Sequence, residues 1–108
     1  SVICNTEHDI IYMHPAAVPR YDNRGGAGLI GQSIFDCHNA HSKKIIEQVL
    51  AWFLESPAHN IMYTYRNEKD NKDVYMVALR GASEEVIGYY EKHEYRNAET
   101  EKTFVPEN

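Results

Sequence analysis

One amphipathic segment, set between two groups of β-rich segments, constrains the fold of this 108-residue chain more than any other feature. Its apolar positions recur at i, i+1, i+4, i+5 and i+8 and share one helix face: Ile45, Ile46, Val49, Leu50 and Phe53. Asn39 or Ser42 is suited to cap the start of the helix, and Pro57 stops it. We therefore predict a helix over residues 42–55 whose apolar face packs against a sheet.

The segments on either side of this helix are rich in β-branched and aromatic residues. Before the helix, residues 2–4 and 10–13 flank a polar turn and predict a hairpin. After it, residues 61–65, 72–80 and 86–94 are separated by polar turns and predict a three-stranded antiparallel meander. The hairpin and the meander must join one sheet if the helix is to cover a face. The predicted fold class is α+β, a five-stranded antiparallel sheet with helices covering one face.

The length of the chain fits one folded unit, because domains cluster at about 100–150 residues. We assign residues 1–94 to this domain and residues 95–108 to a polar C-terminal tail or linker, in which Phe104 and Val105 are candidate anchors. The connector between the hairpin and the helix holds four glycines, but neither GxGxxG nor GxxxxGK[ST] occurs in it. We therefore expect no phosphate-binding loop.

Composition argues against two classes of partner. Sixteen acidic and eleven basic residues give a formal net charge of −5, and the scattered bases do not form the positive patch that nucleic-acid binding requires. The longest apolar runs, residues 49–54 and 74–79, fall far short of the roughly 20 residues that cross a bilayer. We therefore expect neither nucleic-acid nor membrane contacts.

The cysteines indicate the compartment. Two cysteines without CxxC spacing suit a reducing compartment, so we expect a cytoplasmic protein.

Several segments, in this order and spacing, resemble a PAS domain. They are residues 11–17 (IYMHPAA), residues 29–38 (LIGQSIFDCH), the amphipathic helix and residues 86–91 (VIGYYE), which together extend over nearly all of the chain up to Glu94. The closest resemblance is to short stand-alone PAS proteins of bacteria, in which IG-x-S-hydrophobic-x-x-CH precedes the long helix. The chain departs from the pattern at His14, where PAS chains usually carry Asn, and at residues 82–85, where they usually carry an Asp-x-x-Gly turn.

The resemblance implies a sensor module rather than an enzyme. Such a module binds a small-molecule ligand or cofactor between the concave sheet face and the long helix, and it signals through homodimer or partner contacts. Residues carried over by position to the ligand site are Ser33, Phe35, Cys37, His38, Ile46, Leu50, Phe53, Tyr63, Tyr75, Val77 and Tyr89. Which tyrosine of each strand points inward is left open.

Two of the six histidines lie where a metal site is conceivable. His38 and His41 are three residues apart and share a face if this region is helical. Zinc would need two further ligands, so the favoured interpretation is that both histidines cap or hydrogen-bond at the helix start. Haem needs only one axial histidine. Some PAS sensors bind haem through a histidine on or near the long helix, and His41 or His38 is then the candidate ligand; the cofactor is otherwise unassigned.

Cys37 has two interpretations. It is either a redox-sensing thiol beside His38 or, as we favour, a small buried apolar residue next to Phe35. The Asn-Cys-Arg-Phe-Leu motif of flavin-photoadduct PAS domains does not occur, which disfavours a flavin photoreceptor. Ser33 and Asp36 complete the residue types of a nucleophilic site, but neighbours in sequence rarely align as a relay, and we predict no enzyme.

The eight tyrosines leave one structural alternative open. They suit a ligand pocket, because each combines an apolar ring with a polar tip, but tyrosine is also a common residue of half-exposed strands. In the alternative, the side chains of the domain fill its core and leave no room for a ligand, and an exposed sheet face forms a homodimer.

Overall fold

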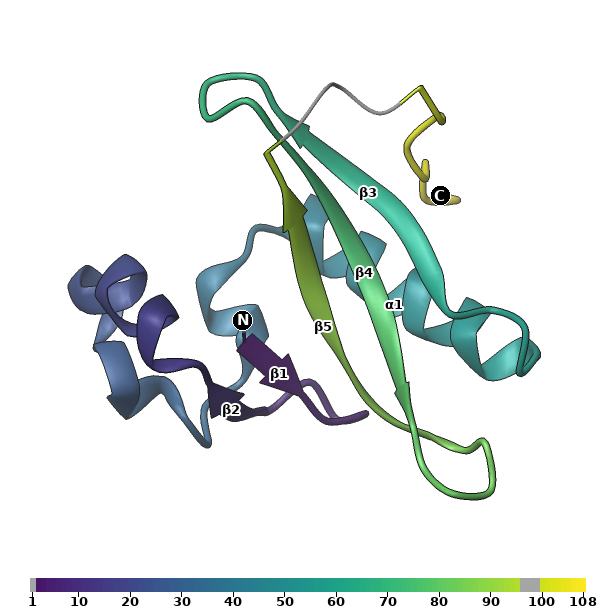
Figure 1. Ribbon diagram of the computed structural model, residues 1–108, viewed down its shortest axis with the longest axis horizontal. Coiled ribbons are helices and arrows are strands. Elements are labelled where there is room, and N and C mark those ends of the chain that lie inside the picture. Colours follow the sequence, from purple (N-terminus) through teal and green to yellow (C-terminus); the bar gives the residue numbers. More distant parts are fainter. Residues whose placement is uncertain (1, 96–99) are drawn as a thin grey trace.

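The computed structural model describes residues 2–95 and 100–108, and it contains a five-stranded sheet, three short 3-10 helices and one α-helix within these residues (Figure 1). In chain order the elements are β1 (Val2–Cys4), β2 (Ile10–Met13), η1 (Pro15–Arg24), η2 (Gly26–Leu29), η3 (Ile34–Cys37), α1 (Ala40–Glu55), β3 (Ile61–Asn67), β4 (Lys72–Arg80) and β5 (Val86–Glu94). The strand predictions are confirmed, with β3 extending two residues further than expected.

The strands lie in the order β2-β1-β5-β4-β3, and every neighbouring pair is antiparallel. The predicted hairpin and meander join where Ile3 and Cys4 of β1 pair with Tyr90 and Tyr89 of β5. Gly88 makes this junction possible, because a Cβ there would lie only 2.3 Å from the carbonyl oxygen of Cys4. The α+β class and the five-stranded antiparallel sheet are therefore confirmed.

Helix α1 begins two residues earlier than predicted. The side-chain oxygen of Asn39 accepts a 2.8 Å hydrogen bond from the backbone N–H of Ser42, so Asn39 is the N-cap. The apolar face of α1 is buried against one face of the sheet, which we call the inner face, and it forms one core with Met76 and Tyr89. In β4, Val74 and Met76 are buried on this inner face, whereas Tyr75 and Val77 lie half-buried on the opposite, outer face.

The C-terminal tail is docked against the domain (Figure 1). The backbone N–H of Phe104 donates a 2.9 Å hydrogen bond to the carbonyl oxygen of Tyr63 on β3, and the Phe104 side chain packs against the core. Further on, the side chain of Gln48 exchanges two hydrogen bonds of 2.8 Å with the backbone of Glu107. Phe104 is thus an anchor as predicted, while Val105 is 79% exposed and does not anchor the tail.

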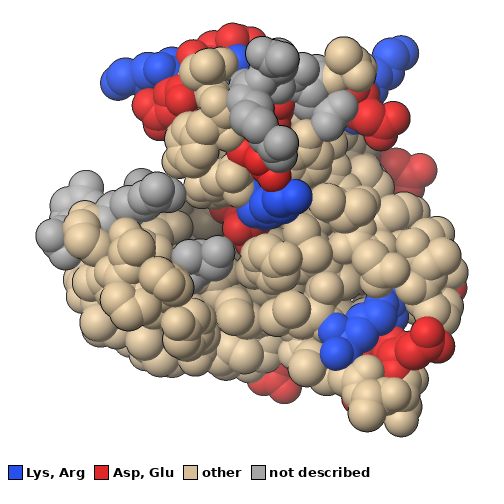
Figure 2. Space-filling view, viewed as in Figure 1, with Lys and Arg blue, Asp and Glu red and all other residues tan. Residues whose placement is uncertain are grey.

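Charged residues on the sheet side of the molecule lie mainly toward its ends, and the middle of that surface is largely uncharged (Figure 2). The same view shows a hollow between the sheet and the lobe that η1 and η2 form. In the described part of the chain, no helix has the length and apolar character that a membrane span requires.

Candidate ligand cleft between α1 and the sheet

A cleft of about 910 Å³ lies between the N-terminal half of α1, the inner face of strands β3 to β5 and the docked tail. Small-molecule sites usually measure about 300–1,000 Å³. Helix α1 contributes Ile45 and Ile46, β4 contributes Val74 and Met76, and Phe104 closes the cleft from the tail. These side chains give the cleft an apolar interior of the kind that binds the body of an organic ligand.

Polar side chains on β4 and β5 form a second part of the cleft wall. Lys72 Nζ lies 3.5 Å from His93 Nδ1, and His93 Nε2 lies 3.6 Å from Glu91 Oε2. An ammonium group only donates hydrogen bonds, so this arrangement places the lone pair of His93 on Nδ1 and its proton on Nε2, facing the carboxylate. Lys72 also lies 5.9 Å from the centre of the Tyr95 ring. The cleft thus combines an apolar interior with a polar row in which a neutral imidazole lies between a cation and a carboxylate.

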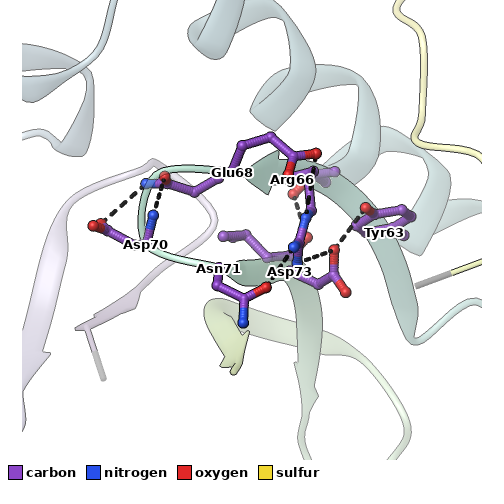
Figure 3. A network of polar contacts seen from close by, with 9 residues as sticks. Tyr63, Arg66, Glu68, Asp70, Asn71 and Asp73 are labelled. Atoms are coloured by element: carbon purple, nitrogen blue, oxygen red, sulfur yellow. Dashed lines mark hydrogen bonds and ion pairs between the residues drawn. The ribbon is translucent and has the colours of Figure 1, made fainter. Parts of the chain in front are cut away.

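A buried polar network holds the β3–β4 hairpin at one end of the cleft (Figure 3). Asp73 is only 1% exposed and accepts a 2.7 Å hydrogen bond from the hydroxyl of Tyr63. Arg66 Nη1 lies 3.5 Å from the same carboxylate, and Arg66 Nη2 donates a 2.6 Å hydrogen bond to Asn71 Oδ1. Arg66 Nε is 3.6 Å from Glu68. Arg66 borders the cleft, and its guanidinium group contacts these hairpin residues, while its buried Nε and Nη1 make no hydrogen bond.

The ring of His38 has a defined orientation at the cleft. Its Nδ1 lies 2.8 Å from the carbonyl oxygen of Ile34, and because a carbonyl only accepts, Nδ1 carries the proton. The lone pair is then on Nε2. His41 lies three residues further on, in the first turn of α1, and it is exposed and borders the same cleft. Because His38 and Asn39 are extended and precede the helix, the two histidines do not share the helix face that their spacing suggested. In the part of the chain that the structure describes, no cluster of three or more His, Cys, Asp or Glu residues is suited to hold a metal ion.

No protein-family model matches the chain, and no curated protein is significantly similar to it. The fold and the chemistry of the cleft are therefore the features that bear on function. That chemistry is suited to binding a small molecule that has both an apolar and a charged part.

The structure places the predicted site residues in different environments. His38, Ile46 and His41 line the cleft. Leu50 and Phe53 are buried in the core beneath the helix, at 6% and 0% exposure.

The strand residues of the predicted site do not line this cleft. Tyr75 and Val77 lie on the outer face, where Tyr63 is paired with Tyr75 in register and uses its hydroxyl to bind Asp73. The physical reason is the alternation of side chains along a strand, which gives the inner face of β4 to Lys72, Val74 and Met76. Tyr89, by contrast, is on the inner face, but it belongs to the core beside β1.

The segment before α1 holds the remaining predicted residues. The hydroxyl of Ser33 accepts a hydrogen bond from the backbone N–H of Phe35 and caps η3. The ring of Phe35 lies 4.4 Å from that of His8. Cys37 is half-buried and, with His38, borders a smaller hollow of about 400 Å³. Of the residues from Ser33 to His38, His38 alone is in the lining of the 910 Å³ cleft.

A buried cluster of Cys4, Tyr89 and His8 was not predicted. Tyr89 is 2% exposed, its hydroxyl lies 2.8 Å from His8 Nδ1, and it also hydrogen-bonds Cys4. Burial raises the pKa of the Cys4 thiol to about 11 and raises that of Tyr89, and it lowers the pKa of His8. All three groups are therefore neutral at pH 7, and Cys4 is not a nucleophile. Only the pairing of β1 with β5 brings them together, which sequence spacing does not reveal.

Proposed function

We propose that the chain is a PAS-type sensory module that binds a small ligand in the cleft between α1 and the sheet. The antiparallel sheet, the helix on its inner face and the cleft between them agree with what the PAS resemblance implies. The observation that carries the proposal is the cleft itself, because it combines a ligand-sized volume with an apolar interior and a charged edge. The function is binding and signalling rather than turnover.

Signalling through a homodimer is the second part of this proposal. On the outer face, residues in register across all five strands form a continuous apolar row: Tyr12, Ile3, Tyr90, Val77 and Ile61. Tyr12 and Ile61 at its two ends are 45% and 50% exposed. Exposed apolar surface that crosses a whole sheet is typical of interaction faces, and it supports contact with a second copy of the chain.

A ligand assay with a matched pair of variants tests the function. Native mass spectrometry of the purified protein is expected to show a reproducible added mass that disappears in Ile45→Trp, because the larger side chain fills the cleft. Leu54→Trp is the control, since Leu54 is on the same helix but is 62% exposed and does not line the cleft. A bare protein that shows no added mass under any mild condition, with a dimer as the only assembly, would favour the ligand-free dimerisation module.

One observation favours haem as a second candidate ligand. The hydrogen bond from His38 Nδ1 to Ile34 leaves Nε2 as the lone-pair nitrogen, and ligating histidines in proteins usually donate their other N–H to a carbonyl or carboxylate. Haem would supply the redox and gas-binding chemistry, while His38 would hold the iron from the edge of the cleft. Titration with haem tests this candidate: a Soret band is expected with the wild type and is lost in His38→Ala. Unchanged binding in both His38→Ala and His41→Ala excludes axial ligation by either residue.

A further inference from the structure

One cation of the cleft is half-buried and has no carboxylate partner among the side chains that the structure describes. Lys72 lines the cleft, and its ammonium group contacts a nitrogen of His93 at 3.5 Å and the ring of Tyr95 at 5.9 Å. Among the residues whose side chains the structure describes, which leave out 1, 20, 22–24 and 96–99, no ion pair joins Lys72 to Asp or Glu. A cation removed from water without a counter-ion loses solvation that neither an imidazole nor an aromatic ring fully replaces. The ammonium group is therefore available to an anion that enters the cleft.

The cleft lining also contains a carboxylate, that of Glu91, which lies on the far side of His93 from Lys72. Glu91 faces Nε2 of His93, whereas Lys72 faces Nδ1, so the imidazole ring separates the two charges. Arg66, the other cation at the cleft border, is held by Asn71 and Asp73. Lys72 is thus the cation on the inner face of β4 that an anion at this end of the cleft would meet.

Apolar surface extends from Lys72 along the same strand. Lys72, Val74 and Met76 occupy alternate positions on the inner face of β4, and a strand rises about 3.3 Å per residue, so Met76 lies roughly 13 Å from Lys72. Across the cleft, Ile45 and Ile46 face this surface from α1. The cleft therefore presents a single cationic end followed by an elongated apolar surface.

We propose that the ligand is an organic anion with an elongated apolar body, a carboxylate whose head group binds Lys72 and whose body lies along Val74 and Met76. The inference rests on the proposed function, because it assigns the chemical class of the ligand in the same cleft. A hydrogen-bonded ion pair to a half-buried ammonium contributes enough to make the anion bind at least about tenfold more tightly than a neutral molecule of the same shape.

Three molecules of equal chain length test the ligand class: decanoate, decanol and decylammonium, each titrated below its micelle concentration and followed by calorimetry and backbone-amide NMR shifts. Decanoate is expected to bind at least about tenfold more tightly than the other two and to shift the amides of Val74 and His93. Lys72→Met is expected to remove this preference, while Lys72→Arg retains it. Lys69→Met is the matched control, because Lys69 is an exposed lysine in the turn of the same hairpin.

The outcomes separate this inference from the proposed function. If decanol or decylammonium binds as tightly as decanoate, the anionic class is overturned and the cleft remains a ligand site. If Lys72→Met binds decanoate as the wild type does, Lys72 is not the head-group residue. If none of the three molecules binds, the ligand class is overturned, and the native mass measurement decides the proposed function separately. Lys72→Gln provides a second variant in case Lys72→Met does not fold.

Discussion

Arg80 Nη2, at the end of β4, lies 2.8 Å from the carbonyl oxygen of Phe53 in the last turn of α1. The same nitrogen lies 2.9 Å from the carbonyl oxygens of Ser56 and His59. The last carbonyls of a helix have no partner within the helix and carry the negative end of its dipole. One side chain of the sheet therefore caps the C-terminal end of the helix and ties it to the end of β4.

Arg80→Met is expected to lower the free energy of unfolding by about 2–3 kcal/mol, because it removes a charged donor from several carbonyl groups at once. Arg80→Lys is expected to recover only part of this loss, since an ammonium lacks the planar fork of the guanidinium. Urea denaturation measures both. Lys44→Met on the exposed face of α1 serves as the control, and a loss of less than about 0.5 kcal/mol in Arg80→Met would show that the cap is not stabilising.

The hydroxyl of Tyr63 is the donor to a carboxylate that is almost completely buried. Tyr63→Phe removes this donor and is expected to destabilise the protein by about 1–3 kcal/mol, the usual effect of depriving a buried polar group of a partner. Tyr65→Phe is the matched control on the same strand, because Tyr65 is 56% exposed. The comparison is made by thermal and urea unfolding, and equal stabilities of the two variants would contradict the network.

Because of the buried Cys4 thiol, the free energy of unfolding is expected to fall as the pH rises into the alkaline range. Its pKa is raised from 9.0 to about 11 in the folded protein, so between these values the unfolded chain has lost the proton and the folded chain has kept it. The contribution of Cys4 to the free energy of unfolding is therefore fully present below pH 9, and it falls by roughly 1.4 kcal/mol per pH unit up to pH 11. Tyr89 titrates in the same direction.

The measurement is urea unfolding of the wild type and of Cys4→Ala at intervals from pH 8 to pH 11. The variant starts from a lower stability, because a buried side chain is shortened, and its stability is expected to decline less steeply above pH 9. Parallel slopes would show that Cys4 does not titrate as described. Alkylation gives a second readout at pH 8, at which Cys37 is expected to react before Cys4, because Cys4 is only 2% exposed.

The continuous apolar row on the outer face of the sheet is the expected dimer interface. Ile61→Lys places a charge at one end of the row, at a side chain that is half exposed, and is expected to shift a dimer toward monomer without unfolding the domain. Sedimentation velocity measures the assembly, and circular dichroism confirms the fold. Leu54→Lys on α1 is the control for an exposed apolar residue elsewhere. A dimer that persists in Ile61→Lys would mean that the row is not its interface.

Local periodicity was sufficient to predict most of the fold. The helical spacing from Ile45 to Phe53 and the polar turns between β-rich runs depend on neighbours within a few residues, so α1 and all five strands were found in the sequence. The side chain of Asn39 was likewise recognisable as a cap. The extension of β3 by two residues lies at the hairpin, where the network of Arg66 and Asp73 continues the pairing beyond the apolar run.

The site was less predictable, because its residues meet only through the sheet register. Nothing in the spacing of Lys72, Glu91 and His93 indicates that a ladder between β4 and β5 places them on one face. A one-residue change of register would instead have turned Tyr75 and Val77 toward α1. Phe104 was recognisable as a candidate anchor of the tail, but a single phenylalanine in a polar segment carries no periodic signal that could show where it docks.

The seam between Ile3 and Tyr90 brings together the first and last strands of the fold at the centre of the sheet. To form this pairing, the chain must bring together two strands that are separated by nearly the whole domain. The conformational entropy of that long segment is lost before the pairing contributes any stability. During synthesis, the edge of β1 that pairs with β5 therefore has no partner until β5 has left the ribosome. Truncation just before Val86 is expected to leave the β1–β2 hairpin without a strand that joins it to the unit of α1, β3 and β4.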